Sequence, residues 1–271
     1  MVRKVDFFIV GSQKGGTTAL EAFLRAHPGI QMGLKKELHF FDNEALDWNS
    51  PDHAILHSAF KPAASEVLRG EATPIYMYWP NSMERLKDYN PEAKLIVMLR
   101  HPALRAYSHW KMEMSRNNET FSFPLAISDV GRLRVSGAPR GVHRKFSYVE
   151  RGFYAAQIAR MLNLFRASNI LFLRTDELWH APNETLNRIS RFLGIFGRGL
   201  RSVPLEYIVP LQPRIFDAMP EDSRAYLNNL YSSDVAATAE MTGLDLADWL
   251  DPHYAEPMRA DLYPLKIRSA A

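Results

Sequence analysis

The segment Gly11-Ser12-Gln13-Lys14-Gly15-Gly16-Thr17-Thr18 (GSQKGGTT) combines glycine, threonine and lysine as a phosphate-binding loop does. A Walker A loop has the pattern G-x-x-x-x-G-K-[ST], and two glycines and the final threonine of the segment match it. Thr17 stands where the Walker lysine belongs, and Lys14 lies earlier in the loop. Three hypotheses follow: an altered nucleoside triphosphate site, a chance run of small residues, or a loop for another phosphate-bearing donor.

The flanks of this loop predict a strand before it and a helix after it. Residues 5–10 (VDFFIV) form a short apolar run that is typical of a buried parallel strand. Leu20, Phe23 and Leu24 have helical spacing, the two threonines are candidate caps for the helix start, and His27-Pro28-Gly29 is a stop signal. The loop would therefore lie at the carboxyl end of a strand, where open α/β sheets bind ligands.

The alternation of strand and helix continues along the chain. Strands are predicted at 94–99 (KLIVML) and 170–173 (ILFL), and helices at 105–113, 154–165, 184–193 and 220–231. We predict an α/β fold with a central parallel β-sheet flanked by helices, similar to P-loop nucleotide-binding proteins. We expect a single domain over residues 1–271, with its core at about 5–250.

Composition narrows the function. The chain has 271 residues, no cysteine, and 33 basic against 30 acidic residues. The missing cysteines exclude disulfides, thiolate metal sites and cysteine nucleophiles. The small positive excess suits an anionic small ligand and gives no reason to expect nucleic acid or membranes as partners. The apolar run at 7–10 is too short for an export signal, so we expect a cytoplasmic protein.

A triphosphate-dependent kinase needs features that the sequence lacks. No predicted strand ends in a Walker B-type aspartate, and the second strand is followed by Arg100. Kinases and ATPases use magnesium to neutralise the charge that develops on the phosphates. Sulfuryl transfer makes a smaller demand, since the moving group is neutral overall and a lysine beside the leaving phosphate is sufficient.

Several segments together resemble the sulfotransferases that use 3′-phosphoadenosine 5′-phosphosulfate (PAPS), in the branch of heparan sulfate sulfotransferases and their bacterial relatives. The residues at 7–20 (FFIVGSQKGGTTAL) are similar to the family's 5′-phosphosulfate loop, and those at 94–110 (KLIVMLRHPALRAYSHW) to its 3′-phosphate site. The residues at 37–42 (ELHFFD) resemble the segment with the catalytic base in glycan 3-O-enzymes. Further landmarks match in order at 70–76 and 148–154.

The resemblance implies a role for each matched residue. Lys14 would stabilise the leaving phosphate, and Gly15, Gly16, Thr17 and Thr18 would hold the 5′-phosphate. Arg100 and Ser108 would bind the 3′-phosphate, for which a guanidinium is well suited. Glu37 would be the general base, supported by His39, and no metal would be required. The product of the donor would be adenosine 3′,5′-bisphosphate (PAP).

Two departures from the family pattern leave the acceptor open. The glycan 3-O-enzymes have a lysine where this chain has Ala72, and a Lys-Gly-Arg loop of which only Arg214 remains, with Gln212 in place of the lysine. Arg214 is a candidate donor contact. The acceptor would be a carbohydrate or a small-molecule metabolite with a hydroxyl or, with less support, an amine, and the oligomeric state is open.

Other features have plainer interpretations. Residues 131–145 are interpreted as a basic loop, either solvated or facing an anionic ligand. His53 and His57 have metal-ligand spacing but no acidic third ligand nearby. The alternative functions are a small-molecule kinase of P-loop type and an inactive nucleotide-binding module. We expect a bacterial, cytoplasmic sulfotransferase.

Overall fold

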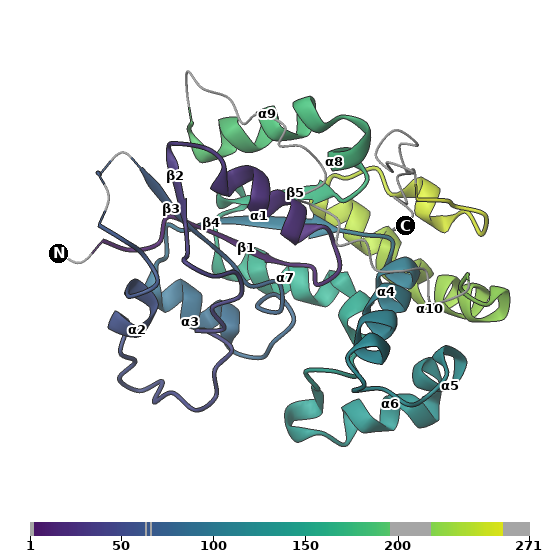
Figure 1. Cartoon of the computed structure of the whole chain (residues 1–271). Helices are drawn as coiled ribbons and strands as arrows, with labels where there is room; N and C mark the ends of the chain where they lie inside the picture. The colour runs from purple at the N-terminus through teal and green to yellow at the C-terminus, as the bar shows by residue number, and fades with distance from the viewer. Residues whose placement is uncertain (1–2, 63, 66, 196–217, 257–271) are drawn as a thin grey trace, which may run out of the picture.

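The computed structural model describes residues 3–62, 64–65, 67–195 and 218–256. Its centre is one sheet of five parallel strands in the order β2-β3-β1-β4-β5, with helices on both faces (Figure 1). The strands are β1 (Phe7–Gly11), β2 (Ile30–Met32), β3 (Leu68–Ala72), β4 (Lys94–Leu99) and β5 (Ile170–Arg174). The predicted α/β fold with a central parallel sheet is confirmed.

The central strands are the ones that the sequence predicts most clearly. All five residues of β1 are buried, and only Lys94 of β4 is partly exposed. Both faces of these strands are covered, so every position favours an apolar side chain.

The strands β2 and β3 have no clear signal in the sequence. β2 has only three residues, and β3 (LRGEA) includes Arg69 and Glu71. Gly70 lies directly beside Phe7, and a Cβ at Gly70 would come within 2.1 Å of the Phe7 ring. The glycine therefore permits close packing of the phenylalanine on the sheet.

Two groups of helices cover the two faces of the sheet (Figure 1). One hydrophobic cluster joins the sheet to α1 (Thr17–Arg25), α8 (Glu177–His180) and α9 (Pro182–Leu193). The other joins it to α3 (Ser82–Tyr89), α4 (Pro102–Ser115), α7 (Tyr154–Leu164) and α10 (Glu221–Thr242). The remaining elements are α2 (Ala54–His57), α5 (Phe123–Ile127), α6 (Asp129–Ser136) and the short 3₁₀ turns η1 (Pro139–Gly141), η2 (Glu150–Gly152), η3 (Ala167–Asn169) and η5 (Ala247–Leu250).

The predicted helices are present, with bounds that differ by a few residues or, for α10, by a longer extension. α4 and α9 begin with proline, which is favourable in the first turn, and α9 ends at Gly194 in the left-handed conformation (φ 80°). Within the described ranges, no helix has the length and apolar character needed to cross a lipid bilayer.

Candidate active site

The glycine loop follows β1 and packs against the ends of two neighbouring strands. A Cβ on Gly15 would lie 2.5 Å from the carbonyl oxygen of Met98 in β4, so no larger residue fits there. The hydroxyl of Thr175, which directly follows β5, donates to the Gly15 carbonyl at 2.7 Å. The loop is thus held in place by the residues at the carboxyl ends of β4 and β5.

The start of α1 lies beside this loop and presents backbone donors that have no acceptor within the helix. Gly16 precedes the helix in the left-handed conformation (φ 84°) and is its N-cap, and neither threonine caps the helix with its side chain. The expectation of a threonine cap was therefore wrong. Because the first N–H groups of a helix have no intrahelical acceptor, the N–H groups of Thr17 and Thr18 are candidates to bind an anion.

Lys14 has a perturbed ammonium group. Its Nζ lies 3.8 Å from the sulfur of Met112 on α4. Burial, followed by the charge of three neighbouring cations, lowers the pKa of Lys14 from 10.5 to about 8, against an opposing effect of Glu37. The three cations are Arg100, Lys111 and Arg116. The loop therefore lies in a positive field that an anionic ligand would neutralise.

Arg100 follows β4 and lies next to the loop. Its Nη1 donates to the carbonyl of Lys14 at 3.3 Å. Its Nε and Nη2 donate to the carboxylate of Glu256, with a distance of 2.7 Å for the Nε contact. Ser108 is half-buried in the second turn of α4. The Arg100 guanidinium, which is predicted to bind a phosphate, thus forms an ion pair with a carboxylate. No pattern in the sequence pointed to Glu256 as its partner.

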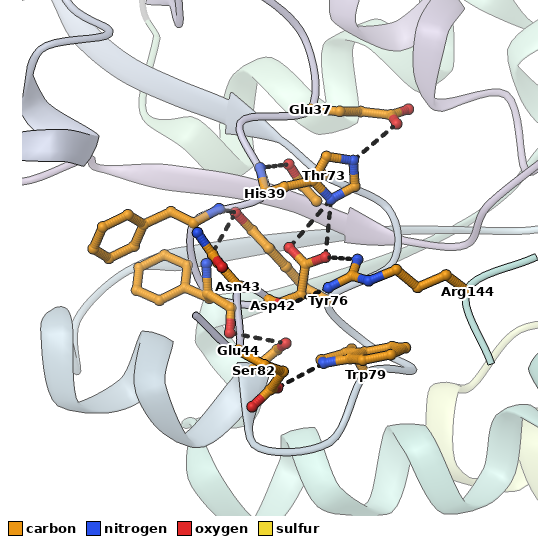
Figure 2. A network of polar contacts seen from close by, with 12 residues as sticks. Glu37, His39, Asp42, Asn43, Glu44, Thr73, Tyr76, Trp79, Ser82 and Arg144 are labelled. Carbon is orange, nitrogen blue, oxygen red and sulfur yellow. Dashed lines mark hydrogen bonds and ion pairs between the residues drawn. The ribbon is translucent and has the colours of Figure 1, made fainter. Parts of the chain in front are cut away.

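Three acid–base side chains form a chain of contacts after β2 (Figure 2). His39 Nε2 lies 3.5 Å from Glu37 Oε2, and His39 Nδ1 lies 2.9 Å from Asp42 Oδ2. Burial raises the pKa of Glu37, but hydrogen bonds from His39 and Lys36 outweigh it and lower that pKa to about 2. Hydrogen bonds to Asp42 and then Glu37 raise the pKa of His39 to about 9. At neutral pH an imidazolium therefore lies between two carboxylates.

Asp42 and Arg144 are site residues to which the sequence analysis assigned no role. The Asp42 side chain is fully buried and forms an ion pair with Arg144. The Arg144 guanidinium also lies over the ring of Trp79, 4.2 Å from its centroid. The motif at 37–42 included Asp42, but its link to Arg144 spans 102 residues and has no local signal.

A cavity of about 220 Å³ opens beside Glu37 and His39. Its lining includes Gln13 of the glycine loop and three cations, Arg116, Arg144 and Lys145. Arg116 is also one of the cations that lower the pKa of Lys14. The cavity therefore adjoins the proposed base, and its cations also favour a polar or negatively charged occupant.

The basic stretch at 131–145 is only partly a loop. α6 extends to Ser136, so the first six residues of the stretch are helical, which corrects the prediction. Arg134 donates to both carboxylate oxygens of Glu119 at 3.0 and 2.9 Å, and Arg132 pairs with Glu150 at 2.9 Å. These two arginines are paired within the protein away from the cavity, whereas Arg144, which pairs with Asp42, and Lys145 line it.

His53 and His57, the pair with metal-ligand spacing, lie beside Tyr89. His57 Nε2 contacts the hydroxyl of Tyr89 at 3.0 Å, and the ring centroids of His53 and His57 are 6.4 Å apart. In the part of the chain that the structure describes, no group of three or more His, Asp or Glu side chains could hold a metal ion. Gln212 and Arg214 lie outside the described residues, so Arg214 stays a prediction.

Comparison with known proteins identifies the class of this chain. A family model described as "Sulfotransferase domain" matches residues 4–205. The chain therefore belongs to the sulfotransferase domain family, and the resemblance drawn from its motifs is confirmed. A crystal structure of a sulfotransferase from Alicyclobacillus acidocaldarius is similar with a TM-score of 0.75 and 27% identity, over 92% of this chain and 99% of that one.

The matches to curated relatives cover a smaller share of those proteins than the match to the bacterial crystal structure does. Heparan sulfate glucosamine 3-O-sulfotransferase 6 of Homo sapiens is 32% identical over 190 residues, which cover 69% of this chain and 51% of the relative. A bifunctional heparan sulfate N-deacetylase/N-sulfotransferase 1 of Caenorhabditis briggsae is 24% identical over 278 residues, covering 91% of this chain and 31% of the relative. The chain thus spans about half, or less, of these relatives.

Proposed function

We propose that this chain transfers a sulfuryl group from PAPS to a hydroxyl of a carbohydrate or a small-molecule metabolite. One observation supports this more than any other. Lys14 lies among the anion-binding groups of the loop and Arg100, and it also lies close enough to Glu37 for that carboxylate to affect its pKa. A candidate base and a candidate leaving-group cation are therefore neighbours, although 23 positions separate them in the chain.

The residues present fit a donor with two phosphate positions. The N–H groups at the start of α1, with Lys14, would hold the 5′ side, and Arg100, with Ser108, the 3′ side. The ion pair of Arg100 with Glu256 supports an anion site at that guanidinium. When bound, the donor would supply a sulfuryl group on a phosphate that leaves with negative charge.

The chain's own groups have complementary protonation states for this reaction. Lys14, with a pKa of about 8, is mostly protonated at neutral pH and would neutralise charge that develops on the leaving phosphate. Glu37, whose contacts with His39 and Lys36 lower its pKa to about 2, is ionised and lines the cavity, where it would accept the proton of a hydroxyl. His39 would orient the Glu37 carboxylate through their contact at 3.5 Å.

The names of the relatives favour a glycan acceptor. One set acts on heparan sulfate glucosamine as 3-O-sulfotransferases, and the bifunctional relatives include an N-sulfotransferase activity. A hydroxyl acceptor is thus supported first, and an amine second. Ala72 is buried in β3, and its carbonyl accepts from the Glu37 N–H at 3.0 Å, so this position contributes no cation to the cavity.

Calorimetric titration with PAP, ADP and magnesium-ATP tests the proposal. We expect wild type to prefer PAP strongly, and Arg100→Ala to lose about 10- to 100-fold in affinity because charge-assisted hydrogen bonds are worth about 1.5–3 kcal/mol. Arg166→Ala is a matched control, since that side chain is 75% exposed and pairs only at the surface. Stronger binding of magnesium-ATP would favour the kinase instead, and PAP binding without transfer to any acceptor would favour an inactive module.

A further inference from the structure

Two segments of the chain meet along a row of consecutive hydrogen bonds. We call residues 37–42 the base segment and residues 70–77 the supporting segment. Five successive backbone N–H groups of the base segment donate to the supporting segment. The pairs are Glu37 N to Ala72 O at 3.0 Å, Leu38 N to Glu71 Oε1 at 3.2 Å, His39 N to Thr73 Oγ1 at 3.4 Å, and Phe40 N and Phe41 N to Tyr76 Oη at 3.0 and 3.5 Å.

The base segment needs such support because its backbone is strained. Glu37 and His39 have φ angles of 62° and 54°, in the left-handed region that non-glycine residues rarely adopt. Residues in this region persist when the surrounding structure over-determines them, and they gather at functional sites. Both strained residues are the ones with acid–base roles in the proposed function.

The supporting side chains are buried and have polar atoms aimed at the base segment. Four of the five donors above are accepted by side chains of Glu71, Thr73 and Tyr76, which are 1%, 0% and 0% exposed. The hydroxyl of Thr73 also donates to Glu71 Oε1. Glu71 Oε2 has no hydrogen-bond partner among the described residues, which is costly for a buried carboxyl group. A residue retained only for packing would be better replaced by an apolar one.

The supporting segment also holds on to β1, the strand that leads into the glycine loop. Thr73 N donates to Ile9 O at 3.1 Å, and Met77 N donates to Val10 O at 3.0 Å. Its backbone thus binds the strand before Lys14, while its side chains bind the segment with Glu37. The supporting segment therefore sets the placement of the base relative to the lysine.

We propose that Glu71, Thr73 and Tyr76 are positioning residues that fix Glu37 and His39 against the glycine loop. This inference rests on the proposed function. Reaction rates are sensitive to such placement, because an error of about 1 Å costs about 100-fold in rate.

Tyr76→Phe is the sharpest test, since it removes only the hydroxyl that accepts from Phe40 and Phe41. We expect kcat for transfer of labelled sulfuryl from PAPS to heparan sulfate to fall about 10- to 100-fold. The Kd for PAP should stay within about twofold, and the amides of residues 40 and 41 should exchange with deuterium faster. Tyr226→Phe, on the exposed face of α10, should change none of these. A purely structural role would weaken PAP binding together with kcat.

A second pair of variants guards against misfolding. Thr73→Val keeps the side-chain volume and removes the hydroxyl, whereas Thr73→Ser keeps the hydroxyl and should recover most of the lost kcat. Hydrogen exchange of the base segment does not depend on an active enzyme, so it tests the positioning even if wild type binds PAP and transfers nothing. Unchanged exchange in both Tyr76→Phe and Thr73→Val, or unchanged kcat where transfer occurs, would overturn the inference.

Discussion

Glu256 and Arg100, 156 positions apart in the chain, form an ion pair in which two nitrogens of the guanidinium donate to the two carboxylate oxygens. The surrounding residues hold Glu256 near Arg100. The ring of Tyr254 stacks on His101 with centroids 5.0 Å apart, and the Tyr254 hydroxyl contacts Asp176 at 3.3 Å. A phosphate that binds Arg100 has to compete with this carboxylate.

Glu256→Gln is therefore expected to strengthen PAP binding. The amide has no charge to oppose a phosphate, and a partly exposed ion pair is worth about 1 kcal/mol or less, so we expect a gain of up to about 5-fold. Calorimetry at constant ionic strength measures it. Glu92→Gln, at a side chain that is 65% exposed, should leave the Kd unchanged. Weaker binding in Glu256→Gln would show that Glu256 supports the site rather than competing for it.

Donor binding should take up a proton at alkaline pH. The pKa of Lys14 is about 8 in the free protein, and a bound phosphate would raise it. The Kd for PAP should change little between about pH 7 and 8, above the phosphate pKa of about 6, and should rise at higher pH by up to about tenfold per pH unit. Titrations in buffers with different ionisation enthalpies count the protons. In Lys14→Arg the slope should disappear because arginine stays charged, and a slope that persists would assign the proton to another group.

Removal of the base should affect turnover and spare donor binding. We expect Glu37→Gln to lower kcat by about 10²–10⁴, the usual range for general acid–base catalysis, with a change in PAP affinity of less than about threefold. Initial rates with labelled PAPS give kcat, and calorimetry gives the Kd for PAP. A variant that keeps full kcat would remove Glu37 from the proposed chemistry.

The stability of the fold should depend on His39 at alkaline pH. Its folded-state pKa of about 9 lies above the ordinary 6.5, so its contacts stabilise the protein fully below pH 6.5 and lose this effect as the pH rises through 9. Lys14 has the opposite sign, because its lowered pKa costs stability below about 8 and that cost is relieved at higher pH. The informative quantity is the difference in Tm between wild type and His39→Gln. It should shrink between pH 7 and 9.5, and a constant difference would contradict the assignment.

The sequence predicts the parts of this fold that depend on local pattern. The apolar runs of β1 and β4 and the helical spacing of Leu20, Phe23 and Leu24 are sufficient without knowledge of distant contacts. The strands β2 and β3 are not predictable in this way. β2 is too short to show a period, and β3 includes Glu71, which is buried because the base segment covers it and donates to it.

The candidate site likewise contains some residues that local sequence patterns predict and others that they do not. The glycine loop and Arg100 follow directly from strands that the sequence reveals, so their neighbourhood was expected. Glu37 was linked to them only through the family resemblance, since it follows β2, and β3 lies between that strand and β1, which leads to Lys14. The contacts of Arg144 with Asp42 and of Glu256 with Arg100 span more than a hundred residues, and no local pattern predicts them.

The strand order has a consequence for how such a protein can diversify. From β1 the chain first builds β2 and β3 on one side of that strand and only then crosses to β4 and β5 on the other. The groups proposed for nucleotide recognition follow β1 and β4, whereas the base follows β2 and is supported by β3. The molecule is thus modular. Grafting residues 33–48 and 70–77 from a relative should therefore change acceptor preference more than nucleotide affinity.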